Sequence, residues 1–160
     1  MSPSKPLVGI LMGSKSDLEV MSEASKALGE FGISCEMKVA SAHRSPDLVH
    51  EYVSGAHERG MKIIIAGAGG AAHLAGVCAS LTPLPVIGVP VESKSLKGLD
   101  SLLSTVQMPP GVPVATVGIN SAKNAGLLAV RLLALSDSDL MAKLQASRKK
   151  MAEDVRAIKI

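Results

Sequence analysis

The stretch "MKIIIAGAGGAAHL" (Met61–Leu74) decides the fold class of this 160-residue chain. It starts with a nearly unbroken apolar run, continues into glycine and alanine, and ends just past a histidine. A short, continuous apolar run is typical of a strand in a parallel sheet, where helices cover both faces. We therefore predict a buried strand at Met61–Ala66, followed by a glycine-rich loop at Gly67–His73.

The same alternation of apolar strand and helical segment occurs four more times. Further strands are predicted at Leu7–Met12, Ser34–Val39, Val86–Val89 and Val114–Val117. Five strand–helix units in succession indicate a three-layer α/β fold with an open, doubly wound parallel sheet. Among doubly wound orders we expect the flavodoxin-like one, 2-1-3-4-5. A single domain is expected over residues 1–160, with its core at 7–135.

Capping residues mark the helix boundaries. Ser45 and Pro46 are typical of an N-cap and a first helical position, and Gly60 lies just past the expected end of that helix. The third helix is expected to begin near Ala71, and another is expected at Ala122–Leu135.

A last helix is predicted at residues 138–158, after the sheet is complete. Its apolar residues form one stripe: Leu140, Leu144, Met151, Val155 and Ile158. Such a stripe either folds back on its own domain or packs on a neighbouring subunit. We favour the neighbouring subunit, because exposed apolar stripes usually mark contacts.

Composition excludes several classes of protein. The net charge of +3 is basic, but aromatic residues are only 1% of the chain, too few to stack nucleic-acid bases. We interpret the basic C-terminal segment as a solvated helix face, so no nucleic-acid partner is expected. No apolar run reaches the roughly 18 residues that span a bilayer, so no membrane partner is expected. Cys35 and Cys78 are far apart, which predicts neither a disulfide nor a zinc site and favours a cytoplasmic location.

Three polar or glycine-rich loops follow the first three strands: "GSKSD" (Gly13–Asp17), "SAHRSP" (Ser41–Pro46) and "GAGGAAH" (Gly67–His73). Ligands of open α/β sheets bind beyond the carboxyl ends of the strands, near the point where strand order reverses. In the predicted order, strands 2, 1 and 3 are neighbours. We therefore expect the three loops to converge on one crevice.

The first two loops suit a phosphorylated ligand. Ser14 and Ser16 offer hydroxyls at a helix N-terminus, and Asp17 could accept hydrogen bonds from sugar hydroxyls. An ordinary N-cap by Ser16 or Asp17 explains the first loop equally well. Arg44 suits a phosphate, and His43 beside it suits a general acid–base, although a solvent-facing loop histidine is the alternative.

The third loop has two interpretations of its own. Successive backbone N–H groups around Gly69 and Gly70 could form an anion-binding nest, or a space for a small carboxylate or carbon dioxide. Small residues could instead serve close helix–strand packing. Gly67, Gly69 and Ala72 also match G-x-G-x-x-A, a weak dinucleotide-binding fingerprint that supports a rival oxidoreductase function.

Together, "GSKSD", "SAHRSPD", "AGAGGAAHL", "PVIGVPV" and "GLDSLLSTVQMPPGVPVATV" resemble the PurE family, N5-carboxyaminoimidazole ribonucleotide mutases. The likeness runs without a break from about Val8 to Leu133. One departure is visible, because Ala75 in "HLAG" stands where bacterial mutases usually have proline.

The resemblance implies a step of purine biosynthesis, in which a carboxylate moves from nitrogen to a ring carbon without metal, nucleotide or organic cofactor. It implies His43 as the acid–base group, with His73 and the Gly67–Gly70 loop lining the carboxylate pocket. The expected catalytic residues are thus His43 and His73. The expected substrate-binding residues are Ser14, Ser16, Asp17, Ser41, Arg44, Gly67, Ala68, Gly69, Gly70 and Leu74. A homo-octamer, with sites completed by neighbouring subunits, is also implied.

Three alternatives stay open at this point. A carboxylase of the same family would take carbon dioxide directly with aminoimidazole ribonucleotide. The oxidoreductase would bind a nicotinamide or flavin cofactor. A ribonucleotide-binding module without catalysis would bind the ligand and leave it unchanged.

Overall fold

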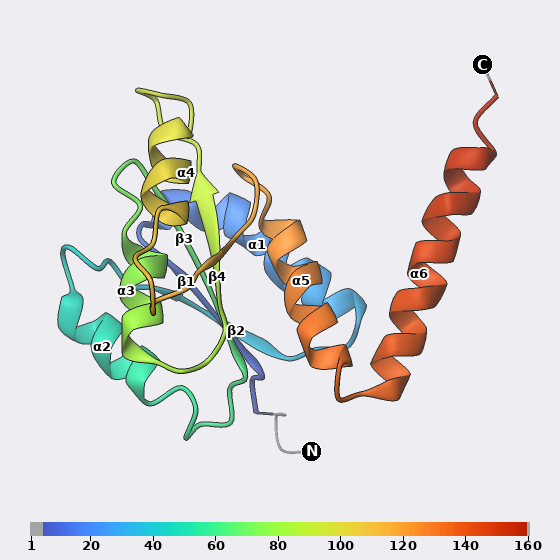
Figure 1. Cartoon of the computed structure of the whole chain (residues 1–160), viewed down its shortest axis with the longest axis horizontal. Helices are drawn as coiled ribbons and strands as arrows, with labels where there is room; N and C mark the ends of the chain where they lie inside the picture. Colours follow the sequence, from blue (N-terminus) through green and yellow to red (C-terminus); the bar gives the residue numbers. More distant parts are fainter. Residues whose placement is uncertain (1–4, 160) are drawn as a thin grey trace.

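Five parallel strands form one sheet in the computed structural model, which describes residues 5–159 (Figure 1). They are β1 (Val8–Met12), β2 (Cys35–Val39), β3 (Ile63–Gly69), β4 (Val86–Val91) and β5 (Ala115–Thr116). Their spatial order is β2-β1-β3-β4-β5. The predicted three-layer α/β fold and flavodoxin-like order are thus confirmed, and β1 lies between β2 and β3 at the point where strand order reverses.

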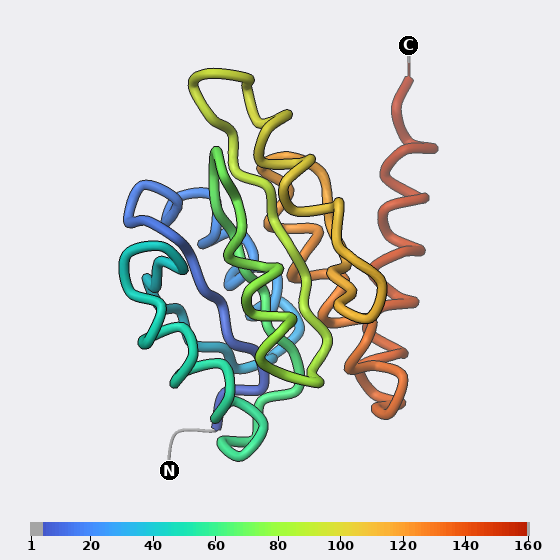
Figure 2. The backbone as a smooth tube through the Cα atoms, turned by 60° about the vertical axis from the view of Figure 1, so that its left-hand side comes forward, coloured from blue at the N-terminus to red at the C-terminus, as the bar shows by residue number. Residues whose placement is uncertain are grey.

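Helices cover both faces of the sheet (Figures 1 and 2). On one face lie α1 (Leu18–Glu30), which follows the short 3-10 turn η1 (Lys15–Asp17), and α5 (Ala122–Ala134). On the other lie α2 (Pro46–Ser54), α3 (Leu74–Leu81) and α4 (Leu99–Val106).

The two cores follow from the two-residue period of a strand. Along β1, Val8, Ile10 and Met12 pack in the cluster under α1 and α5. Leu11 points the other way, into the cluster under α2 and α3. Every residue of β1 is buried, as the continuous apolar run requires in a sheet covered on both faces.

The third strand is longer than its apolar run suggests. Gly67 and Gly69 were expected in a loop, but they continue the ladder of β3 opposite Val89 and Val91 of β4. A side chain at Gly67 would collide with buried Met21 of α1, so this glycine allows close helix–strand packing. The loop prediction for residues 67–69 was therefore wrong, and close packing explains the glycine at 67.

Two helix boundaries also differ from the prediction. The second helix ends at Ser54 rather than near Gly60, because the chain passes through further turns before Gly60, whose φ is +93°. The third helix starts at Leu74, three residues after Ala71.

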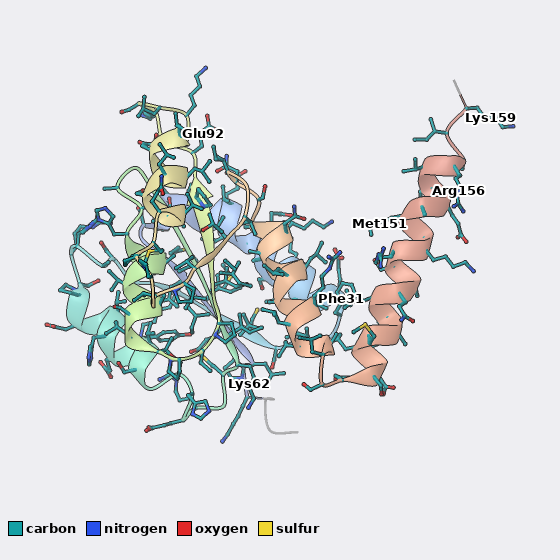
Figure 3. The ribbon with its side chains drawn as sticks, viewed as in Figure 1. Phe31, Lys62, Glu92, Met151, Arg156 and Lys159 are labelled. Atoms are coloured by element: carbon teal, nitrogen blue, oxygen red, sulfur yellow. The ribbon has the colours of Figure 1, made fainter. Side chains whose placement is uncertain are left out.

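The last helix, α6 (Ser138–Arg156), is divided between two environments. Leu140 and Leu144 are buried in the α1–α5 core of the same chain. Met151 and Val155 are 54% and 68% exposed on the part of α6 that stands away from the domain (Figures 1 and 3). Ile158 is 69% exposed and lies past the end of the helix, which stops at Arg156 rather than at the predicted residue 158. The first half of the predicted stripe thus folds back on its own domain, and the second half has no cover in the described chain.

Cys35 and Cys78 are both free thiols. Burial raises the pKa of Cys78 to about 12, so this thiol is a core residue rather than a nucleophile. Among residues 5–159, no helix is both long and apolar enough to cross a bilayer.

The crossing of α1 and α5 yields a first prediction, at Gly126. A Cβ added there would lie 2.7 Å from the backbone oxygen of Ala24, which a packed helix cannot easily move. We expect Gly126→Ala to lower the free energy of unfolding in urea by roughly 1–3 kcal/mol.

Gly29→Ala is the matched control, because a Cβ added at this other helical glycine meets nothing within 4 Å. Alanine there should be neutral or raise the free energy of unfolding by up to about 1 kcal/mol. Equal effects of Gly126→Ala and Gly29→Ala would contradict the close-approach explanation.

Candidate active site

The loops after β1, β2 and β3 meet at the carboxyl edge of the sheet, where they surround a cavity of about 420 Å³. This volume falls within the roughly 300–1,000 Å³ usual for small-molecule sites. Its lining residues are Gly13, Ser14, Ser16, Asp17, Ser41, Ala42, His43, Arg44, Ala68, Gly69, Ala71, Leu74, Glu92 and Ser93. The structure thus brings together the three loops that the strand order places side by side.

The first loop is held by a capping box around η1. The Ser14 hydroxyl accepts a hydrogen bond from the Ser16 N–H at 3.3 Å, and the Ser14 N–H donates to the Asp17 carboxylate at 3.1 Å. Ser14 therefore caps η1, whereas Asp17 occupies the N-cap position of α1 without a side-chain cap bond to that helix. Because the Ser14 hydroxyl acts as acceptor here, its own hydrogen stays available to a ligand.

Asp17 lines the cavity, although its residue is only 7% exposed. Burial raises the pKa of its carboxyl above the ordinary value, against the opposing effects of hydrogen bonds from Ser16 and Ser14 and of the Arg44 charge. Because the folded chain holds this proton more tightly than the unfolded chain, ionisation of Asp17 costs stability as the pH rises above 3.8. A ligand hydroxyl donating to this carboxylate would favour its ionised form.

Arg44 joins the first two loops. Its Nη2 donates to the Gly13 carbonyl oxygen at 2.9 Å, and its Nε donates to the Ser41 hydroxyl at 3.4 Å. Arginine has five N–H donors in a planar fork. Within residues 5–159 these are the guanidinium's bonds, so its other N–H groups can reach an anion in the cavity.

His43 and His73 form a pair across the second and third loops. The Nε2 of His43 lies 2.8 Å from the Nδ1 of His73, and the rings are close to perpendicular at 86°. One ring nitrogen must donate and the other accept, so the pair can hold one additional proton, whereas a second would set two N–H groups against each other. His43 lines the cavity, whereas His73 lies against His43 and not among the lining residues.

The third loop lines the cavity with little side-chain bulk, through Ala68, Gly69 and Ala71. Two backbone N–H groups of this loop, however, are already bonded within the chain and are not free to bind an anion. The Gly70 N–H donates to the Ser101 hydroxyl at 2.8 Å, and the Ala72 N–H donates to the Ser104 hydroxyl at 3.0 Å.

Two of the expected binding residues, Gly67 and Gly70, do not line the cavity. The G-x-G-x-x-A pattern is also not a dinucleotide fingerprint, because its two glycines lie inside β3 rather than in the turn that opens a helix.

Sequence reasoning missed Glu92 and Ser93, which line the same cavity. Both follow β4, and Figure 3 shows Glu92 at the end of that strand. Asn120 holds this segment in place: its Oδ1 accepts the Glu92 N–H at 2.8 Å and its Nδ2 donates to the Glu92 carboxylate at 3.3 Å. These two residues could have been predicted to line the site. In the predicted order β4 lies next to β3, and Glu92 and Ser93 follow its carboxyl end. Gly13, Ala42 and Ala71 were missed as lining residues as well.

The side chains around the cavity offer charged and polar groups for binding and proton transfer. Within residues 5–159, no three His, Cys, Asp or Glu side chains are grouped so as to hold a metal ion. The arrangement provides a cation beside a helix N-terminus, a buried carboxylate, an imidazole pair and a wall of small residues. These parts can bind an anionic, hydroxylated molecule and move a proton on it.

Comparison with known proteins places the chain in a family. Residues 7–154 match the family model described as AIR carboxylase. A Pyrococcus abyssi protein named N5-carboxyaminoimidazole ribonucleotide mutase is 62% identical over 146 residues, 91% of this chain and 84% of that protein. A Mycobacterium tuberculosis protein of the same name is 58% identical over 153 residues, 96% of this chain and 88% of its own.

Other similar proteins extend this comparison. The phosphoribosylaminoimidazole carboxylase of Vigna aconitifolia chloroplasts is 56% identical over 149 residues, 93% of this chain but 27% of that protein. The crystal structure of Treponema denticola PurE matches with a TM-score of 0.82 at 30% identity, covering 97% of this chain and 99% of that one. The motifs, the sheet order and these likenesses agree: the chain belongs to the AIR carboxylase family, the PurE family that its sequence resembles.

Proposed function

We propose that this chain is an N5-carboxyaminoimidazole ribonucleotide mutase, which converts N5-carboxyaminoimidazole ribonucleotide to 4-carboxy-5-aminoimidazole ribonucleotide in purine biosynthesis. One observation carries the proposal: His43, Arg44 and a wall of glycine and alanine surround a single cavity of about 420 Å³. The high identity to several proteins that bear the mutase name supports it.

The ribonucleotide is bound through its phosphate and ribose. Arg44 has unused guanidinium donors, and the Ser14 hydroxyl lies beside it at a helix N-terminus, so both suit the phosphate. The buried carboxylate of Asp17 suits the ribose hydroxyls. Ser16 and Ser41 hold the carboxylate and the guanidinium through hydrogen bonds at 3.3 and 3.4 Å.

The reaction is a balanced isomerisation. The bond between the exocyclic nitrogen and its carboxylate carbon breaks, carbon dioxide leaves, and the electron pair stays on nitrogen, which takes a proton. Ring carbon C4 then forms a bond to the carbon dioxide and loses its own proton. His43 can donate the first proton and accept the second, because histidine changes charge near neutral pH.

Carbon dioxide must stay beside the ring between these two steps. The wall formed by Ala68, Gly69, Ala71 and Leu74 provides space without a nucleophile that could trap it. Holding the gas in contact with C4 replaces an encounter in solution with a step inside one complex, which raises the rate of recarboxylation.

A second function within the family is carboxylation of aminoimidazole ribonucleotide by carbon dioxide taken directly from solution. The observation in its favour is the 56% identity to a protein named phosphoribosylaminoimidazole carboxylase. We favour the mutase, because the relatives that bear its name match over 84–90% of their own length, against 27% for the carboxylase.

We further propose a homo-octamer in the cytoplasm, with each site completed by neighbouring subunits. The exposed apolar residues Met151 and Val155 of α6, with Ile158 just beyond it, support a subunit contact. Sedimentation of the full chain as a monomer would contradict it.

The function is tested by offering the purified chain each substrate without added metal or nucleotide. We expect rapid formation of the 4-carboxy product from the N5-carboxy substrate, with no requirement for bicarbonate. Product formed from aminoimidazole ribonucleotide and bicarbonate, but not from the N5-carboxy substrate, would favour the carboxylase. Binding without product from either substrate would leave a ribonucleotide-binding module.

A further inference from the structure

The segment Gly70–His73, between β3 and α3, has no polar side chain before His73 that could hold its backbone in place. It consists of glycine and alanine up to His73, and Gly70 has a φ of +70° with nothing within 4 Å of an added Cβ. Yet it determines where Ala71 meets the cavity and where His73 meets His43. Side-chain hydrogen bonds that hold this backbone must therefore come from residues elsewhere in the chain.

Helix α4 supplies that anchor. Ser101, Ser104 and Thr105 lie three and four positions apart, so their hydroxyls share one face of the helix. Ser101 is fully buried and Thr105 is 2% exposed, although hydroxyl-bearing side chains are usually found at the surface. We name these three residues the α4 hydroxyl face.

Each hydroxyl of this face meets the backbone of the segment. The Gly70 N–H donates to Ser101 Oγ at 2.8 Å, and the Ala72 N–H donates to Ser104 Oγ at 3.0 Å. Thr105 Oγ1 lies 3.4 Å from the Ala72 carbonyl oxygen. These contacts join residues more than 30 positions apart in the chain.

The same hydroxyls are fixed on their other side. Ser101 Oγ donates to the Val91 carbonyl oxygen at 2.6 Å, which ties the third loop to the end of β4. Ser104 Oγ donates to the Asp100 carbonyl oxygen at 2.7 Å, inside α4 itself. A hydroxyl has one hydrogen and two acceptor sites, so Ser101 and Ser104 have no spare hydrogen with which to swing toward a ligand.

The start of α4 is fixed in turn. The Ser93 hydroxyl lies 2.7 and 2.8 Å from the two carboxylate oxygens of Asp100, and this hydrogen bond lowers the pKa of Asp100. Ser93 itself lines the cavity. The α4 hydroxyl face therefore belongs to one connected unit that runs from the cavity edge to the third loop.

We propose that Ser101 and Ser104 are positioning residues for the carboxylate transfer. They touch neither the cavity nor the imidazoles; they hold the wall that confines carbon dioxide and the backbone that carries His73. This inference rests on the proposed mutase function. It concerns the retention of carbon dioxide beside C4 between decarboxylation and recarboxylation.

The test compares Ser101→Ala and Ser104→Ala in the full chain. For each variant, the yields of 4-carboxy product and of aminoimidazole ribonucleotide are measured from the N5-carboxy substrate, after subtraction of non-enzymatic decarboxylation. We expect kcat to fall about tenfold, because small displacements of reacting groups are costly. The share of aminoimidazole ribonucleotide should rise severalfold, because a loosened wall releases carbon dioxide before recarboxylation.

Two further variants sharpen the comparison. Ser22→Ala is the control, since the Ser22 hydroxyl donates only to the Leu18 carbonyl oxygen within α1, at 2.6 Å. It should behave as the parent chain. Ser104→Thr keeps the hydroxyl and should restore the parent product ratio. Binding of aminoimidazole ribonucleotide should change less than about threefold in Ser104→Ala, because Arg44 and Asp17 lie on other loops.

Each outcome decides the matter. A purely structural role would lower the melting temperature and leave the product ratio at the parent value, which would overturn the proposal. If Ser101→Ala fails to fold, the partly buried Ser104 provides the deciding variant. If the parent chain itself makes no 4-carboxy product, the proposed function fails first, and that result is visible before any variant is compared.

Discussion

His43→Ala is expected to lower kcat by roughly 10²–10⁴-fold, the usual contribution of a positioned acid–base group. Its imidazole lines the cavity, and in the proposed mechanism it gives a proton to nitrogen and takes one from C4. Alanine removes both transfers at once. The dissociation constant for the ribonucleotide should change less than about threefold, because Arg44, Ser14 and Asp17 retain their places. Single-turnover assays together with equilibrium binding check the two quantities separately.

The control for this variant is His50→Ala, since His50 is an exposed histidine on α2 away from the cavity. It should leave both kcat and binding at the parent values. A second replacement, His43→Asn, keeps a polar side chain that cannot titrate, so it should be as inactive as alanine. A kcat for His43→Asn close to that of the parent chain would contradict the acid–base role, whatever the kcat of the alanine variant.

In the proposed mechanism, the histidine pair allows one ring to serve both proton transfers. The His43–His73 contact at 2.8 Å needs one donor and one acceptor, so His43 can exchange a proton with substrate while its other contact adjusts by a change of tautomer or charge. The site therefore needs no second acid–base residue on the opposite wall. A single ring is sufficient because the reaction takes one proton from His43 and returns one proton to it.

The strands and their order could be predicted because they depend on local, repeated signals. The apolar run of β1 is buried at every position, and the succession of strand–helix units predicted a doubly wound parallel sheet. The order 2-1-3-4-5 was the one expected among doubly wound orders, and the structure has it. The convergence of three loops followed from that order alone. Predicting this convergence required no knowledge of contacts between side chains.

The rest depended on distant contacts that no local pattern encodes. Gly67 extends β3 because Met21 of α1 occupies the space of its side chain, and the sequence of residues 61–74 does not contain that fact. Ser101 and Ser104 look like helix-surface serines until the third loop is placed against them. The apolar stripe at the C-terminal end could be recognised in the sequence. Its residues up to Leu144 are buried and the later ones are exposed, because the surface of the domain ends near Leu144.

Arg44→Ala is expected to weaken ribonucleotide binding by roughly 10- to 150-fold, which corresponds to the loss of about 1.5–3 kcal/mol for hydrogen bonds to a charged group. The guanidinium bridges the first two loops through Gly13 and Ser41, and Arg44 lines the cavity. Once substrate saturates the enzyme, kcat should fall much less than in His43→Ala. Isothermal titration with the ribonucleotide, beside steady-state kinetics, separates the two effects.

Two variants show whether charge or geometry is responsible. Arg44→Lys keeps the charge but loses the planar fork, so it should bind between the parent and the alanine variant. Arg131→Ala removes an exposed arginine of α5 that is distant from the cavity, and it should bind as the parent does. The phosphate assignment makes a further demand: the loss caused by Arg44→Ala should shrink when the ligand is the nucleoside without phosphate. An equal loss with and without the phosphate would place this guanidinium on another part of the ligand, because a group that binds phosphate has nothing to lose when the phosphate is absent.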